Sequence, residues 1–294
     1  MDVCSTPGVF SLWSGAPGER RSEWERFLNP VDWYRQMLQS VSLADAGIDA
    51  AALKPAEVDV ARGADLDVGT VTVDYEGRDH LPSSSTLAAL AEGVDVRVTT
   101  PVRADGFDPL GDDSLVDALP SSVSRVLVAG HPAYLTDAER ERAIAPRLRA
   151  GVAACRDPWV GTEGVERLAL AAGGTQFELL GPGADRRLRA LRQAGFDGDI
   201  ALYAPTVLTD DEDAVLDALG DYAARRTPVA EALPDGAATG AAAIGRARDV
   251  LSRAVRDYGL VGDVDSVADR VAELRAAGVD TVVAYPARDL DPFL

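Results

Sequence analysis

Lysine is almost absent from this chain. Lys54 is the single lysine among 29 basic residues, and the others are arginine, whereas Asp and Glu number 48, for a formal net charge of −19. A surface this negative repels nucleic-acid phosphates and anionic membranes, so we expect neither as a partner. Many carboxylates with almost no lysine favour a halophilic protein kept hydrated in concentrated salt, where ions screen its self-repulsion. An ordinary acidic protein is the alternative.

Cysteine and histidine are also scarce. Cys4 and Cys155 form neither a metal-type spacing nor a disulfide framework, and only His80 and His131 could add imidazole ligands, so we expect no metal site. No apolar run reaches the roughly 18 residues of a membrane span. The first residues lack the basic start and apolar stretch of a secretory signal. These absences predict a cytoplasmic protein with reduced thiols.

The chain does contain β-rich runs that alternate with amphipathic helical runs, an order typical of parallel sheets with crossover helices. Eight strand–helix units favour a single (β/α)8 TIM-barrel domain over residues 1–294. An open doubly wound sheet is the alternative, but the first predicted strand lacks the Gly-rich phosphate turn of that fold. The predicted strands are Val9–Trp13, Ala50–Lys54, Val94–Val102, Arg125–Gly130, Trp159–Gly161, Gln176–Gly181, Asp199–Thr206 and Asp280–Tyr285.

Two further segments fall outside this count. Thr70–Glu76 alternates apolar and polar residues, and we predict an extra strand or hairpin within an inserted segment near residues 56–82. It could instead be a barrel strand, with the short fifth strand removed from the count. Thr227–Thr239 is rich in Pro, Ala and Gly with weak periodicity, and it predicts a mobile loop near residues 227–239.

Chemistry in a (β/α)8 barrel lies at the carboxyl ends of its strands. Lys54 ends the second predicted strand, where it could hold an anionic group or act as a base, unless it is simply a solvated surface residue. His131 follows the fourth predicted strand and could donate a hydrogen bond or a proton; the alternative is a loop histidine bonded to backbone. We take these two as the candidate catalytic residues. Candidate substrate-binding residues at other strand ends are Trp13, Arg103, Tyr203, Tyr285 and Arg288.

A glycine-bearing turn, Gly161-Thr162-Glu163-Gly164, opens a predicted helix. Free backbone N–H groups at such a turn can bind phosphate, although Glu163 places negative charge where the phosphate would lie. Gly181 is a loop glycine that could line a ligand.

Several segments, taken in order, resemble the luciferase-like flavin- and F420-dependent monooxygenases and oxidoreductases. The resemblance spans nearly the whole chain and depends on the order and spacing of pieces that are individually loose. The segments are Leu43–Asp49, Asp157–Gly161, Ala194–Asp197, Val261–Asp263, Val267–Leu274 and Ala277–Val283.

The resemblance implies a barrel that binds F420 or FMN at its mouth and transfers a hydride to or from a small organic substrate. It implies cofactor contacts at Thr100 and Pro101, where the family often has a non-prolyl cis peptide, and at Gly161, Thr162 and Gly164. We add Gly181 to the cofactor-binding candidates from its place in a loop after a predicted strand. Two positions depart from the family pattern. Leu53-Lys54-Pro55 follows the second predicted strand in place of an acidic–His pair, and Gly130-His131-Pro132 follows the fourth in place of a Gly-rich run.

These departures keep two rivals open. One is a degenerate TIM barrel without a redox cofactor, acting as a ligand-binding or regulatory protein. The other is a lyase or aldolase that uses Lys54 as a Schiff-base nucleophile. In each case we expect a small-molecule ligand, and the chain could form a homodimer.

Overall fold

The computed structural model describes residues 42–131, 135–287 and 289–294. The predicted strand Val9–Trp13, and with it the candidate Trp13, lies outside these residues, as does the candidate Arg288. No helix in the described part of the chain is both long and apolar enough to cross a membrane.

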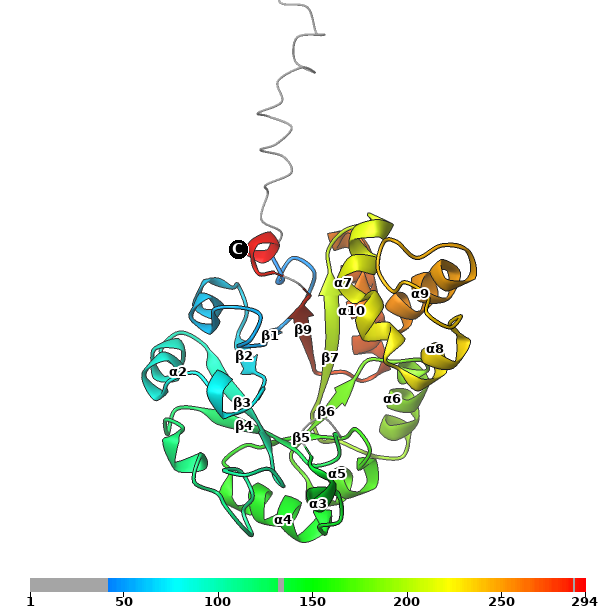
Figure 1. The fold of residues 1–294 in the computed structure, drawn as a ribbon. Helices are drawn as coiled ribbons and strands as arrows, with labels where there is room; N and C mark the ends of the chain where they lie inside the picture. The colour runs from blue at the N-terminus through cyan, green and yellow to red at the C-terminus, as the bar shows by residue number, and fades with distance from the viewer. Residues whose placement is uncertain (1–41, 132–134, 288) are drawn as a thin grey trace, which may run out of the picture. The chain divides into compact units, whose positions relative to one another are not determined.

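Eight parallel strands close into a barrel, which confirms the predicted (β/α)8 fold (Figure 1). Neighbouring strands pair in sequence order from β1 to β7, and β9 pairs with both β7 and β1, so the ring has no free edge. A two-residue strand, β8 (Leu260–Val261), pairs with the end of β7 outside the ring. The barrel strands are β1 (Ala50–Leu53), β2 (Thr70–Val73), β3 (Asp95–Pro101), β4 (Ser124–Val128), β5 (Trp159–Gly161), β6 (Thr175–Leu179), β7 (Ile200–Val207) and β9 (Thr281–Pro286).

The structure corrects the position of β2. This strand pairs with β1 on one side and β3 on the other, so it belongs to the barrel and not to an inserted hairpin. The short β5 is also a barrel strand, between β4 and β6. Sequence reasoning misplaced β2 because the connection before it contains a 3-10 helix, η2 (Val60–Asp65), where a crossover normally shows the period of an α-helix.

The two faces of the barrel strands form different cores. Side chains such as Ala51 and Leu53 point outward into the layer shared with the helices. Ala50 and Ala52 point inward, where they face aromatic side chains from β5, β6, β7 and β9. Inward and outward positions alternate along each strand, so each strand contributes to both cores. The barrel interior is filled by small side chains from β1 and by aromatic side chains from β5, β6, β7 and β9.

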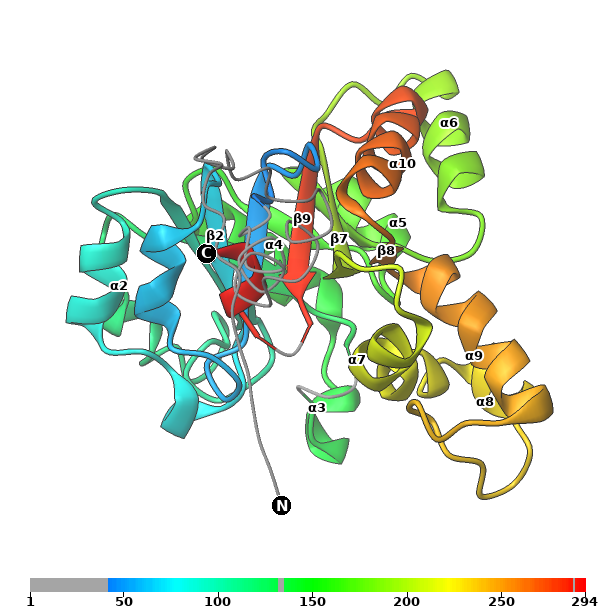
Figure 2. The same cartoon turned by 90° about the horizontal axis from the view of Figure 1, so that it is seen from above.

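Helices cover the outside of the ring (Figures 1 and 2). Their ends follow ordinary capping rules: the side chain of Asp263 accepts from Ser266 N at the start of α10, and α10 ends at Gly278 with a φ of +116°. The helices are α2 (Ser84–Leu90), α3 (Asp137–Arg140), α4 (Ile144–Ala154), α5 (Glu166–Ala172), α6 (Ala184–Gln193), α7 (Glu212–Ala224), α8 (Thr227–Ala232), α9 (Gly245–Tyr258) and α10 (Val264–Ala277), with short 3-10 turns η3 (Arg78–His80), η4 (Val116–Ala118) and η6 (Asp291–Phe293).

The expected loop near residues 227–239 is partly helical. Its first half forms α8, with Pro228 in the first turn, where a missing N–H costs no hydrogen bond. Val229 of α8 packs into a separate apolar cluster with residues of α7 and α9, including Leu216 and Leu251. This packing explains why a segment with weak periodicity is ordered: one buried side chain anchors the short helix.

Candidate functional site

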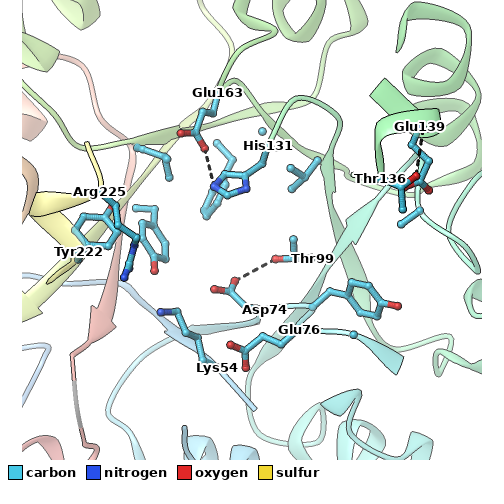
Figure 3. A pocket seen from close by; sticks show the side chains of 18 of the residues that line it. Lys54, Asp74, Glu76, Thr99, His131, Thr136, Glu139, Glu163, Tyr222 and Arg225 are labelled. Atoms are coloured by element: carbon cyan, nitrogen blue, oxygen red, sulfur yellow. Dashed lines mark hydrogen bonds and ion pairs between the residues drawn. The ribbon is translucent and has the colours of Figure 1, made fainter. Parts of the chain in front are cut away.

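A cavity of about 1180 Å³ opens at the carboxyl ends of the barrel strands (Figure 3). Four of the residues selected from the sequence line it together: Lys54, His131, Gly161 and Tyr203. They come from positions far apart in the chain, and the closed ring brings them to one rim.

Aromatic rings form an arc along one side of the barrel interior. Trp159 stacks on Phe177 with ring centroids 5.7 Å apart, Phe177 meets Tyr203 edge-on at 6.0 Å, and Tyr203 stacks on Tyr285 at 6.1 Å. Phe177 and Tyr203 border the cavity. A planar ligand could therefore stack here, because aromatic pairs favour these separations.

Lys54 lies at the end of this arc. Its ammonium group is 3.9 Å from the centroid of the Tyr285 ring and 3.4 Å from Glu57 Oε1. The Tyr285 hydroxyl donates to the other Glu57 oxygen. Burial, with the Glu57 carboxylate, raises the pKa of Tyr285 well above its usual range, so this phenol stays protonated. Tyr285 thus belongs to the site through its contact with Lys54.

Asp74, directly after β2, is a residue that sequence reasoning missed. Thr99 Oγ1 donates to Asp74 Oδ1 at 3.2 Å, and both residues line the cavity (Figure 3). Desolvation raises the pKa of this carboxyl to about 6, although the charge of Lys54 and the Thr99 hydrogen bond oppose the rise. Asp74 can therefore take up and release a proton near neutral pH, as an acid–base catalyst must.

The strand that precedes Asp74 was recognised in the sequence, but it was assigned to an inserted segment and not to the barrel. With the barrel strands counted correctly, Lys54 follows the first strand and Asp74-Tyr75 follows the second. The departure noted at Leu53-Lys54-Pro55 was therefore assigned to the wrong strand, and the residues after the second barrel strand are an acid and a tyrosine.

His131 and Glu163 come from the loops after β4 and β5 and both line the cavity. His131 Nε2 is 3.4 Å from Glu163 Oε2, and Arg226 Nη1 is 3.3 Å from Glu163 Oε1. A carboxylate thus occupies the turn in which the sequence suggested a phosphate site, and it is paired with two basic side chains.

Other candidates from the sequence lie beside the cavity without lining it. Thr100 faces the outer layer, where its Oγ1 accepts from Arg125 Nε at 3.2 Å. Thr162 donates through both its N–H and its Oγ1 to Phe177 O. Arg103 is buried and its Nη1 lies 3.5 Å from Ala129 O. The remaining ones are Pro101, which pairs with Val128 in the sheet, Gly164, and Gly181, which lies against Tyr258. In the part of the chain that the structure covers, no cluster of His, Cys, Asp and Glu is placed to hold a metal ion.

The closed ring with a charged cavity at its mouth defines a (β/α)8-barrel protein with a ligand-sized site. The chain belongs to a family of unknown function, DUF7388, whose model matches residues 43–293. No curated protein matches it. Among solved structures, it is similar to an F420-dependent secondary alcohol dehydrogenase in complex with an F420-acetone adduct, with a TM-score of 0.54 and 11% identity over 84% of this chain and 96% of that chain. This likeness shows a shared fold.

Proposed function

We propose that the protein is a luciferase-like oxidoreductase that binds a deazaflavin of the F420 type at the barrel mouth and oxidises or reduces a small alcohol or carbonyl compound. The observation that carries the proposal is Asp74, a carboxyl with a pKa of about 6 that lines a cavity beside an aromatic arc. The shared barrel fold with an F420-dependent alcohol dehydrogenase supports it.

The residues of the cavity fit such a cofactor. Ligand sites usually measure about 300–1,000 Å³, so about 1180 Å³ leaves room for a ring system and a small substrate. The aromatic arc suits a planar ring, and basic side chains at the rim suit an anionic tail. The cavity is lined by five Lys or Arg side chains and five Asp or Glu side chains, although Asp and Glu outnumber Lys and Arg by 48 to 29 in the whole chain. The basic residues are Lys54, Arg78, Arg142, Arg225 and Arg226.

The phosphate-binding role suggested for the turn at residues 161–164 fits less well. Because Glu163 places a carboxylate there, we assign the anionic tail to Arg225 and Arg226, at the end of α7 and just after it. Both line the cavity, and guanidinium groups bind phosphate and carboxylate through paired N–H donors.

A bound deazaflavin supplies the hydride acceptor or donor. Alcohol oxidation also releases the hydroxyl proton, and Asp74 in its carboxylate form accepts that proton; in the reverse direction the protonated Asp74 returns it. The positive charge of Lys54 and the Thr99 hydroxyl stabilise the carboxylate, which keeps it available as a base. The Schiff-base role for Lys54 gains no support from its contacts, since its amine group lies against the Tyr285 ring and beside Glu57.

The first test is a titration of the purified protein, kept in concentrated salt, with F420 and separately with FMN. We expect saturable binding of F420 with a change in its absorbance or fluorescence, and slow reduction of bound F420 when secondary alcohols are added. If the protein binds FMN and not F420, the cofactor in the proposal changes to FMN and the oxidoreductase class stands. A protein that binds neither would be a ligand-binding barrel without redox chemistry, and the proposal would be wrong.

A double variant sharpens this titration. Replacing Arg225 and Arg226 with Ala removes the charges that we assign to the anionic tail, so F420 affinity should fall by about tenfold or more, as for lost charge-assisted hydrogen bonds. The matched control replaces Arg186 and Arg189 on the exposed surface of α6 and should leave affinity unchanged. Equal effects of the two variants would indicate non-specific attraction by net charge.

A further inference from the structure

Glu163 uses both of its carboxylate oxygens at the edge of the cavity. Oε2 lies 3.4 Å from His131 Nε2 and Oε1 lies 3.3 Å from Arg226 Nη1. Arg226 is itself held, because its Nη2 donates to the Tyr222 hydroxyl and its guanidinium lies 4.5 Å from the Tyr222 ring centroid. A continuous set of contacts therefore runs from Tyr222 on α7 through Arg226 and Glu163 to the imidazole. Figure 3 shows its last step, from Glu163 to His131.

The backbone fixes this arrangement as well. A Cβ on Gly130 would lie 2.2 Å from the carbonyl oxygen of Glu163, which real structures do not permit. The loops after β4 and β5 can approach this closely only because residue 130 is glycine. Gly164, with a φ of +71°, turns the chain directly after Glu163. The spacing between His131 and Glu163 is thus set by two glycines, independently of the side-chain contact.

We propose that Glu163 is a positioning residue for His131. Its carboxylate, held by Arg226, accepts from Nε2 of the imidazole and thereby fixes the ring orientation in which His131 meets the ligand. A neutral imidazole has one donor and one acceptor nitrogen, so a carboxylate beside one nitrogen determines which of them carries the proton. This inference deepens the proposed function and depends on it only for the kinetic test below.

The contact itself can be tested without a cofactor. The chain has two histidines, so imidazole N–H protons give at most a few low-field proton resonances in protein labelled with ¹⁵N-histidine. We expect a protected N–H resonance from His131, assigned by its loss in His131→Asn. His80 is exposed in η3 and should exchange rapidly with water, which makes it an internal control. Glu163→Ala should remove the His131 resonance, whereas Glu163→Gln should retain it because the amide oxygen still accepts.

Kinetics then separate positioning from simple stability. Loss of the carboxylate that orients a metal-bound histidine lowers activity by about 10–100-fold, and we take the same range for an imidazole oriented toward a ligand. We expect Glu163→Ala to lower kcat in this range with KM changed less than about threefold, and Glu163→Gln to recover most of the loss. The neighbouring exposed Glu166 does not line the cavity, so Glu166→Ala is the matched control and should keep wild-type kcat.

The outcomes are distinct. A His131 resonance that persists in Glu163→Ala overturns the inference, and so does an effect confined to KM. If the wild type has no oxidoreductase activity, the proposed function fails while the resonance still decides the inference: its loss in Glu163→Ala supports the pairing and its persistence rejects it. Thermal melting followed by circular dichroism identifies any variant that has lost its fold. If Glu163→Ala is one of them, Gly130→Ala carries the test, because it should move His131 away from Glu163 and remove the same resonance.

Discussion

Asp74 and Glu163 line the same cavity from different sides of the barrel, one after β2 and the other after β5. Asp74 has one hydroxyl donor and the nearby charge of Lys54, and desolvation still raises its pKa to about 6. Glu163 is about one-third exposed and contacts two basic side chains. A carboxyl with too few partners to offset the cost of its desolvation has a raised pKa and suits proton transfer. A carboxylate with a basic partner on each oxygen is better suited to holding other side chains in place.

Loss of the Asp74 carboxyl should lower activity more than loss of the Glu163 carboxyl does. Asp74→Asn keeps the shape and the contact with Thr99 but cannot take up a proton, so kcat for alcohol oxidation should fall by about 10²–10⁴-fold, the usual share of general acid–base catalysis. F420 affinity should change little. The control variant Glu92→Gln removes one negative charge at an exposed position, and the enzyme should keep its full activity. An Asp74→Asn enzyme with wild-type turnover would move the proton-transfer role elsewhere, with His131 the next candidate.

The same variant should be more stable than the wild type at neutral pH. The folded chain binds the Asp74 proton with a pKa of about 6, against 3.8 for an ordinary aspartate, so ionisation of Asp74 destabilises the fold as the pH rises between these values. Above about pH 6 we expect Asp74→Asn to unfold with a free energy higher by on the order of 1–3 kcal/mol. Near pH 4 the two proteins should converge, because Asp74 is then protonated. Urea unfolding at several pH values measures both limits, and a difference that does not depend on pH would contradict the pKa.

Gly130 tests the geometry on the Glu163 side. Gly130→Ala forces a methyl group against the carbonyl of Glu163 and should cost about 1–3 kcal/mol of stability, as overpacking does, while moving His131 away from Glu163. Gly93 has no neighbour within 4 Å of the Cβ position and needs no positive φ, so Gly93→Ala should change stability by less than about 1 kcal/mol. An equal loss of unfolding free energy in the two variants would mean that the loops after β4 and β5 move apart easily to make room for a methyl group.

Sequence reasoning located the Glu163 side of the cavity better than the Asp74 side, for a physical reason. β4 and β5 are followed by recognisable turns and by helical patterns, so His131 and the Gly161 turn fell at strand ends. The connection between β1 and β2 contains a 3-10 helix and lacks the 3.6-residue period that marks a crossover, whereas the connection after β2 contains α2. The strand was therefore excluded from the barrel, and Asp74 with it. The pairing of Glu163 with Arg226 could not be predicted from the sequence, because these two residues lie 63 positions apart and meet only when the ring closes.

The smallest effect concerns Arg226. Its guanidinium and the Glu163 carboxylate are both partly exposed, and such pairs contribute about 0.2–1 kcal/mol. Because Arg226→Ala would also remove the hydrogen bond and ring contact to Tyr222, the pair is tested by Glu163→Gln, which should lower stability by no more than this in dilute buffer. At about 1 M salt, where charges are screened beyond roughly 3 Å, the difference should disappear.

Salt should leave the positioning of His131 intact even as this energy vanishes, since the approach of the two loops depends on Gly130 and not on charge. The His131 N–H resonance in wild-type protein should thus persist across the same salt range. If the resonance disappears together with the stability difference, then the ion pair holds Glu163 in place and the backbone does not. Asp74 and Glu163 would in that case differ only in how strongly each carboxyl group is desolvated.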